Sequence, residues 1–279
     1  MKELDNIQKI LNKKSQGQKI TMLTAYDYAM ASIIDEVGVD MILVGDSVAN
    51  VVLGLNSTTD VGMTEMLHHA KAVRRAVKQA LVIGDMPFES YQKDISQAVI
   101  NAKRFMEEAG CDAIKLEWFN QCPQVVESIV HAGISVMGHV GLTPQRAEEL
   151  GGMKVQGKDA DSAHQIIEDA KVLEDKGCFS VVLECIPEAI AKMITQELSI
   201  PTIGIGAGVY CDGQVLVTHD ILGLSDRFHP KFVKQYVDLK TAMFNGIKQF
   251  CQEVHEQKFP NQEHSYSMKE EELKKLKRV

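Results

Sequence analysis

Long apolar runs are absent from this sequence, and the absence limits the class of protein. No stretch approaches the 18 uninterrupted apolar residues of a membrane span, and residues 1–19 contain no apolar run of signal-peptide length. Basic residues are outnumbered as well, since 30 Lys and Arg against 38 Asp and Glu give a formal net charge of −8. A negative chain is repelled by nucleic acid and by anionic membranes. We therefore expect a cytoplasmic protein with neither as a partner.

The motifs of several common chemistries are also missing. The six cysteines form no Cys-x-x-Cys pair and are scattered through a long chain, which favours neither a zinc site nor a disulfide framework. Neither Gly-x-Ser-x-Gly nor His-Glu-x-x-His occurs, which argues against triad hydrolases and zinc proteases. Residues 203–208 are glycine-rich but lack the dinucleotide-binding spacing and the P-loop lysine.

No linker rich in Pro, Gly or Ser divides the 279 residues. Single α/β barrels reach about 250 residues, and 45% apolar residues are ample for one large core. We predict one domain over residues 1–279, with a polar N-terminal segment at 1–19 and a polar C-terminal tail at about 252–279.

A recurring pattern predicts parallel strands. In four places a helical stretch ends at a glycine (Gly38, Gly110, Gly133, Gly177) and a short, uniformly apolar run follows. The predicted strands lie at about 20–24, 41–45, 81–84, 113–116, 134–138, 180–183, 201–205 and, more weakly, 215–218. Helical periodicity fills the segments between them, at about 26–37, 64–79, 96–109, 123–132, 159–176 and 188–198. This alternation favours a (β/α)8 barrel, although a doubly wound open sheet also produces uniformly apolar strands.

Polar residues follow the ends of five predicted strands. They are Asp46, Asp85, Glu117, His139 and Glu184. The carboxyl ends of parallel strands meet on one face, so we expect these side chains to lie together. Taken singly, each carboxylate could cap a helix or pair with a basic residue, and the histidine could be a core residue.

Four carboxylates at one mouth would carry a charge of about −4, with Lys115 as the nearby cation in sequence. Like charges a few ångströms apart repel by several kcal/mol at intermediate dielectric, so a bound cation is expected. Oxygen ligands with a single imidazole suit Mg²⁺ or a similar divalent ion. Lys115 and Glu117 are two apart on one strand and so face the same side, which would place a cation for a substrate anion beside a metal ligand.

These residues lie in blocks that resemble the ketopantoate hydroxymethyltransferase family. The longest block is Gly138-His139-Val140-Gly141-Leu142-Thr143-Pro144-Gln145. Others span residues 22–27, 44–47, 85–88, 114–117, 155–157, 182–184, 203–208 and 212–214. Phe259-Pro260 and Glu263-His264-Ser265 resemble the end of the family's sequences, so the resemblance runs from about residue 20 to residue 266.

The resemblance implies a (β/α)8 TIM barrel of the phosphoenolpyruvate/pyruvate-domain type. It implies transfer of a hydroxymethyl group from 5,10-methylenetetrahydrofolate to 3-methyl-2-oxobutanoate, which gives 2-dehydropantoate in pantothenate biosynthesis. It also implies Mg²⁺ or another divalent ion as cofactor, and a homo-oligomer that is typically decameric.

By the same resemblance, seven positions receive roles. Asp46, Asp85 and Glu117 match metal ligands; Asp46, Ser47, Asp85 and Lys115 match groups that hold the keto acid; Glu184 matches the proton acceptor, and His139 a supporting active-site residue. A carboxylate base that takes the C3 proton of a metal-chelated keto acid agrees with the residues present.

Two departures from the family pattern flank these positions. The family usually has Gly-Asp-Ser-Leu-Gly-Met where this chain has Val48, Ala49 and Asn50 after Asp46-Ser47, and a glycine where this chain has Glu89. We expect a Cβ at Ala49 to conflict with a glycine-only backbone angle, and Glu89 to add negative charge beside the mouth.

Two alternatives remain beside the transferase. One is a related metal-dependent barrel, an aldolase or lyase acting on another α-keto acid, against which Thr143-Pro144-Gln145 argues. The other is a degenerate, non-catalytic oligomeric family member, which would be expected to have lost Glu184 or a metal carboxylate.

Overall fold

Eight parallel strands close into a barrel in the computed structural model, which describes residues 2–147, 149–225 and 230–276. In chain order they are β1 (Ile20–Thr24), β2 (Met41–Val44), β3 (Leu81–Asp85), β4 (Ala113–Lys115), β5 (Val136–Gly141), β6 (Ser180–Glu184), β7 (Thr202–Ile205) and β8 (Gly213–Leu216). The closing pair joins β1 to β8, with Met22 opposite Val215. The predicted (β/α)8 barrel is therefore confirmed, and the open sheet is excluded.

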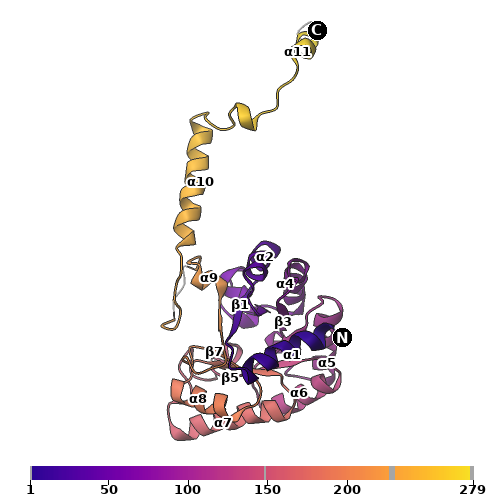
Figure 1. The fold of residues 1–279 in the computed structure, drawn as a ribbon, viewed down its shortest axis with the longest axis vertical. Coiled ribbons are helices and arrows are strands. Elements are labelled where there is room, and N and C mark those ends of the chain that lie inside the picture. Colours follow the sequence, from indigo (N-terminus) through magenta and orange to yellow (C-terminus); the bar gives the residue numbers. More distant parts are fainter. Residues whose placement is uncertain (1, 148, 226–229, 277–279) are drawn as a thin grey trace.

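Six helices of ten or more residues follow the first six strands and surround the barrel (Figure 1). They are α2 (Tyr28–Val37), α4 (Met63–Ala76), α5 (Ile95–Glu107), α6 (Cys122–His131), α7 (Ala160–Asp175) and α8 (Glu188–Glu197). Their order around the barrel is their order in the chain, each packing on the next. Short elements occupy the loops after the strands: α3 (Val48–Val51), η1 (Thr58–Asp60), η2 (Phe88–Ser90), η3 (Pro144–Arg146) and α9 (Thr218–Ile221).

The start of the last strand differs from the prediction. The weak strand expected at 215–218 begins two residues earlier, because Gly213 and Gln214 pair with Ile20 and Thr21. Glycine is required here, since a Cβ on Gly213 would lie 2.6 Å from the Ile20 carbonyl oxygen. The residue that looks like a turn in the sequence is the one that lets β8 approach β1.

The N-terminal segment forms a helix, α1 (Lys2–Ser15), which closes one end of the barrel. Ile7 and Ile10 are buried and belong to the hydrophobic cluster inside the barrel, with Ile20, Met41 and Leu81. A second cluster fills the space between the strands and the surrounding helices. Segment 1–19, predicted only to be polar, therefore supplies part of the barrel interior.

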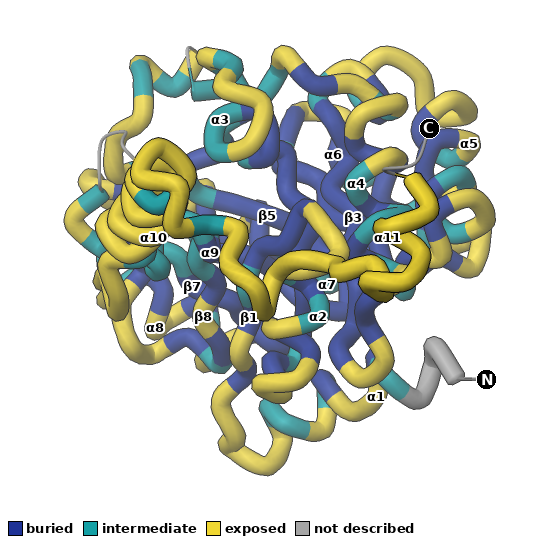
Figure 2. The backbone as a smooth tube through the Cα atoms, turned by 90° about the horizontal axis from the view of Figure 1, so that it is seen from above, coloured by how far each residue is buried: buried dark blue, intermediate teal, exposed yellow. Residues whose placement is uncertain are grey.

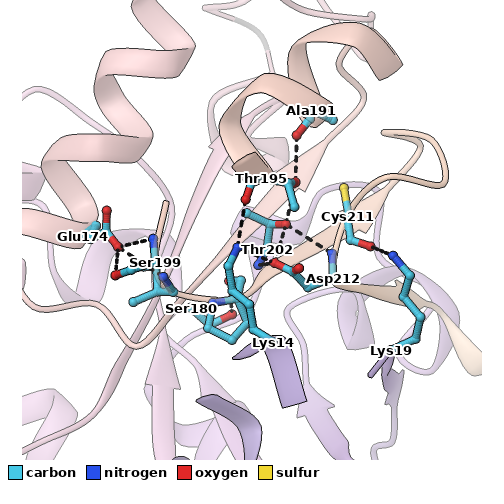
Figure 3. A network of polar contacts seen from close by, with 12 residues as sticks. Lys14, Lys19, Glu174, Ser180, Ala191, Thr195, Ser199, Thr202, Cys211 and Asp212 are labelled. Atoms are coloured by element: carbon cyan, nitrogen blue, oxygen red, sulfur yellow. Dashed lines mark hydrogen bonds and ion pairs between the residues drawn. The ribbon is translucent and has the colours of Figure 1, made fainter. Parts of the chain in front are cut away.

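Polar contacts fix α1 to the last two strands (Figure 3). Lys14 Nζ lies 2.8 Å from Asp212 Oδ2 and donates to the Thr195 carbonyl. Asp212 Oδ2 also accepts hydrogen bonds from the backbone N–H and the hydroxyl of Thr202. Lys19 donates to the Cys211 carbonyl. These contacts lie at the start of β7 and β8, and so at the barrel end opposite to the predicted site.

The C-terminal part extends away from the barrel (Figure 1). It contains α10 (Leu239–His255), η4 (Gln262–His264) and α11 (Glu270–Leu276). None of the residues of α10 is buried, in contrast to the strands (Figure 2). Among the described helices, none has the length and apolar character to cross a membrane.

Candidate active site

The structure brings together all seven predicted site residues at the carboxyl end of the barrel. Asp85, Lys115 and Glu184 are the last residues of β3, β4 and β6, while His139 lies within β5. Asp46, Ser47 and Glu117 follow β2 and β4 by two or three residues. Six of the seven form a continuous row, in the order Asp46, Asp85, Lys115, Glu117, His139, Glu184.

One half of this row centres on a buried lysine. Lys115 Nζ lies 2.8 Å from Asp85 Oδ1 and 3.9 Å from Glu117 Oε1. The other Asp85 oxygen, Oδ2, accepts the backbone N–H of Asp46 at 3.1 Å. All four residues are buried. One cation thus faces three carboxylates that water barely reaches.

Burial and crowding shift the ionisation of this half of the site. Burial, followed by the charges of Asp85 and Glu117, raises the pKa of Asp46 to about 8. Burial also raises the pKa of Asp85, although Lys115 opposes the shift. Burial alone would lower the pKa of Lys115, but the charges of Asp85, Glu117 and Asp46 outweigh it and raise that pKa. The site therefore favours additional positive charge.

The other half of the row places His139 between two glutamates. His139 Nδ1 lies 3.5 Å from Glu117 Oε1, and Nε2 lies 3.3 Å from Glu184 Oε2. Burial works against the charged imidazole, yet contacts with Glu117 and then Glu184 raise the pKa of His139 to about 9. A charged imidazole in this position would attract the carboxylates of both Glu117 and Glu184, although neither ring nitrogen makes a hydrogen bond with a described residue.

Ser47 stands beside a residue that sequence reasoning did not select. Its hydroxyl lies 2.8 Å from the Tyr26 hydroxyl. Tyr26 is fully buried and stacks at a tilt on His219, with ring centroids 5.5 Å apart. Tyr26 belongs to the family block at residues 22–27, which could have pointed to it. Its place in the sequence gave no indication of a hydrogen bond with a residue 21 positions away.

Gln145 and Tyr91 were also missed as members of the site. Gln145 donates from its side chain to Asp46 and from its backbone to Glu117, and the Tyr91 hydroxyl donates to Gln145. Gln145 lies in the loop after β5, inside the longest family block, whereas Tyr91 follows η2. Neither residue lies at the end of a strand, so the criterion that identified the carboxylates, a polar residue following a predicted strand, did not select them.

The expectations about Ala49 and Glu89 are wrong. Ala49 lies in the right-handed helix α3, and its φ is not positive, so its Cβ meets no glycine-only backbone angle. The Glu89 side chain is 74% exposed and pairs with Lys93 at 2.9 Å, so its charge is solvated and offset. Asn50 donates to the Leu55 carbonyl and closes its own loop.

The carboxylates suit a hard cation, although they do not enclose one. Within the described residues, no three His, Cys, Asp or Glu side chains converge on a common point as ligands. Asp46 Oδ1 accepts no hydrogen bond from any described residue, while Oδ2 is engaged. Mg²⁺ commonly binds one or two protein carboxylates and completes its shell with water and substrate. The donor set at this mouth fits that pattern.

Comparison with known proteins identifies the family of the chain. Residues 5–262 match the sequence model of the ketopantoate hydroxymethyltransferase family. The chain belongs to this family. The resemblance found in the sequence motifs is thereby confirmed.

Two relatives illustrate the similarity. The 3-methyl-2-oxobutanoate hydroxymethyltransferase of Syntrophus aciditrophicus is 54% identical over 257 residues, which are 92% of this chain and 94% of the relative. That of Carboxydothermus hydrogenoformans is 53% identical over 263 residues, 94% of this chain and 95% of the relative.

Solved structures with the same fold are much more distant in sequence. A phosphonopyruvate hydrolase in complex with oxalate and Mg²⁺ superposes with a TM-score of 0.62 at 12% identity, covering 98% of this chain and 96% of that one. A 2,3-dimethylmalate lyase of the PEP mutase/isocitrate lyase superfamily gives a TM-score of 0.57 at 14% identity over 75% of this chain and 79% of that one. They share the barrel fold of this chain.

Proposed function

We propose that this family member transfers a hydroxymethyl group from 5,10-methylenetetrahydrofolate to 3-methyl-2-oxobutanoate. The product is 2-dehydropantoate, a step of pantothenate biosynthesis. The observation that carries the proposal is the row from Asp46 to Glu184, which contains six of the seven residues to which the family resemblance gives roles. That row argues against a degenerate, non-catalytic member. A cytoplasmic location remains a prediction.

The keto acid is an anion, and the site offers it the buried ammonium group of Lys115. Lys115 faces Asp85 and Glu117 at the carboxyl end of the barrel, where strand ends converge. We assign Lys115 and the hydroxyl of Ser47 to the carboxylate and keto oxygens of the substrate. The Tyr26 hydroxyl, 2.8 Å from Ser47 Oγ, can hold the serine in orientation.

A divalent ion, Mg²⁺ or a similar one, would be held by the carboxylates of Asp46, Asp85 and Glu117. It would supply positive charge to the chelating oxygens of the keto acid and so make the C3 proton more acidic. The raised pKa values of Asp46 and Asp85 support this assignment, because a carboxylate in this environment is stabilised by a cation. The phosphonopyruvate hydrolase of the same fold, solved with Mg²⁺ and oxalate, gives further support.

Glu184 is assigned as the base that takes the C3 proton. Its side chain is 13% exposed, against 1% for Glu117, so it is the more accessible of the two glutamates beside His139. The C3 carbanion then attacks the methylene carbon carried by the folate, and a carbon–carbon bond forms as one of the two bonds from that carbon to folate nitrogens breaks. Water replaces the second carbon–nitrogen bond and supplies the hydroxyl group, so that the C3 proton and one water proton end on the two folate nitrogens. His139, 3.3 Å from Glu184, supports the base.

A homo-oligomer is part of the proposal, with the decamer typical of the family. Support comes from α10, on which Met243, Ile247, Phe250 and Val254 recur at helical spacing and are all exposed. The barrel leaves a place for such a face, because among the described residues no long helix covers β7 or β8 as helices cover the other strands, and Tyr28 and Ile33 of α2 are exposed. A second copy of the chain is the partner we assign to α10.

The test is product formation by the purified protein. 3-Methyl-2-oxobutanoate and 5,10-methylenetetrahydrofolate are incubated with the protein and Mg²⁺, with and without EDTA, and 2-dehydropantoate is followed by proton NMR. The proposal expects product that requires both substrates and is lost with EDTA. Exchange of the C3 proton without product would contradict the folate as donor. If neither exchange nor product is observed, the keto acid is contradicted as the substrate.

A further inference from the structure

The loop after β5 and the turn after β3 bring two polar side chains between the candidate metal ligands. Gln145 lies in the loop at residues 142–158, and Tyr91 directly follows η2. Both are at least 95% buried. Neither has a role in the reaction described above. Their contacts nevertheless end on Asp46 and on Glu117.

The orientation of the Gln145 amide follows from its partners. Gln145 Nε2 lies 3.1 Å from the Met86 carbonyl oxygen, which can only accept, and 2.9 Å from Asp46 Oδ2. Its oxygen, Oε1, lies 2.6 Å from the Tyr91 hydroxyl. That hydroxyl lies 3.3 Å from the Glu117 backbone N–H, from which it accepts, so its own proton goes to Gln145.

The contacts form a closed circuit. The Glu117 N–H donates to Tyr91, Tyr91 donates to Gln145 Oε1, and Gln145 Nε2 donates to Asp46 Oδ2. The circuit returns to Glu117 because the backbone N–H of Gln145 donates to Glu117 Oε2 at 3.0 Å. In such a network each hydrogen bond orients the next one. One oxygen of each carboxylate is thus held from the loop side.

The circuit leaves the other oxygens facing the site. Asp46 Oδ1 accepts no hydrogen bond from the described residues, and Glu117 Oε1 is the oxygen that lies near Lys115 and His139. Residues that hydrogen-bond to metal ligands fix the ligands' orientation, and their loss typically costs about 10–100-fold in metal affinity. We therefore expect the hydrogen bonds made by this loop to affect the affinity of the site for an ion.

We propose that Gln145 and Tyr91 are positioning residues that hold Asp46 and Glu117 ready for a divalent ion. The inference rests on the metal set assigned under the proposed function. Gln145 acts directly on Asp46, and Tyr91 acts through Gln145 by keeping its amide turned toward Asp46. The loop after β5 is thus part of the ion site, although it supplies no ligand.

Calorimetric titration of the full-length protein with Mn²⁺ alone tests this inference. Gln145→Met keeps the side-chain length and removes the donor to Asp46; we expect a loss of at least about tenfold in affinity. Tyr91→Phe keeps the ring, which packs edge-on against Phe119. It should give a smaller loss of Mn²⁺ affinity, together with a smaller heat of binding. Gln165→Met is the matched control, because Gln165 makes the same amide contact with Asp169 in α7; its affinity should equal that of the wild type.

Thermal unfolding with and without Mn²⁺ separates positioning from folding. The metal-dependent rise in Tm should shrink in Gln145→Met and Tyr91→Phe but not in Gln165→Met, which a general loss of packing would not produce. Wild-type affinity in the two site variants would overturn the inference. If Gln145→Met does not fold, Tyr91→Phe decides it alone. A wild-type protein that binds no Mn²⁺ would instead contradict the metal set of the proposed function.

Discussion

Lys115 Nζ lies 2.8 Å from Asp85 Oδ1, and the exposed fractions of the two side chains are 5% and 1%. The residues stand opposite each other on the neighbouring strands β3 and β4. Pairs this deeply buried add little net stability, because desolvation offsets the attraction, but removing one partner leaves a buried charge. The pair therefore serves the site more than the fold, and losing the lysine should be costly.

Lys115→Met is predicted to lower the free energy of unfolding by about 3–5 kcal/mol at neutral pH. The remaining carboxylates would repel one another without their cation. Urea unfolding at fixed protein concentration measures the change. The control is Lys93→Met, which breaks the exposed pair with Glu89 and should leave stability near that of the wild type. A Lys115→Met protein as stable as the control would show that the pair is not ionic in the folded state.

Asp85→Ala is predicted to weaken divalent-ion binding well beyond tenfold, a change of about 1.4 kcal/mol for each factor of ten. Asp85 is one of three carboxylates assigned to the ion, and it also accepts the Asp46 backbone N–H. Calorimetry with Mn²⁺ measures the affinity. An unchanged affinity would remove Asp85 from the ligand set, whatever happened to activity.

Asp169 gives a pH-dependent prediction outside the site. Burial raises its pKa to about 6, above an unfolded value of about 3.9. Between these values the folded state binds more protons than the unfolded state, so the contribution of Asp169 to stability is full below about pH 4 and falls as the pH rises through 6. Asp169→Asn keeps an acceptor for Gln165 and has no charge to desolvate.

We therefore expect Asp169→Asn to raise Tm at pH 8 and to leave it unchanged at pH 4. Differential scanning at both pH values, with the wild type alongside, makes the comparison. A difference of the same size at both pH values would point to packing instead of charge, and so would contradict the pKa assignment.

The assembly assigned to α10 can be tested with one charge. Ile247→Glu places a carboxylate in the apolar face, while Asn245→Glu places the same group on the other side of the helix. Light scattering should find a smaller particle for Ile247→Glu and the wild-type mass for Asn245→Glu. Identical masses for the two variants would mean that α10 does not hold copies together.

Much of this fold could be predicted because its signals are local. Short runs that are apolar on both faces predicted the strands, and the polar residue after each run predicted the site, since parallel strands end on one face. The alternation of strands and helices favoured a closed barrel without deciding it, because a doubly wound open sheet has the same uniformly apolar strands. The start of β8 was missed because glycine is typical of turns. In this position the lack of a Cβ instead allows Gly213 to pack closely on Ile20.

The parts of the site that escaped prediction depend on distant partners. Tyr91 meets Gln145 across 54 residues of chain, and Gln145 meets Asp46 across 99. No periodicity marks such pairs. The orientation of the Glu89 side chain could not be predicted either, since its ion pair with Lys93 and its exposure depend on the path of the loop after η2. Sequence identified the charged groups, and structure was needed for what orients them.

The central claim, that Glu184 takes the C3 proton of the keto acid, is tested by deuterium exchange. 3-Methyl-2-oxobutanoate is followed by proton NMR in D₂O with Mg²⁺ and either the wild type or Glu184→Gln, and EDTA is added as a control. A positioned base contributes about 10²–10⁴-fold, so the variant should exchange at least about a hundredfold more slowly while still binding Mn²⁺. Wild-type exchange by a metal-binding Glu184→Gln protein would contradict the account.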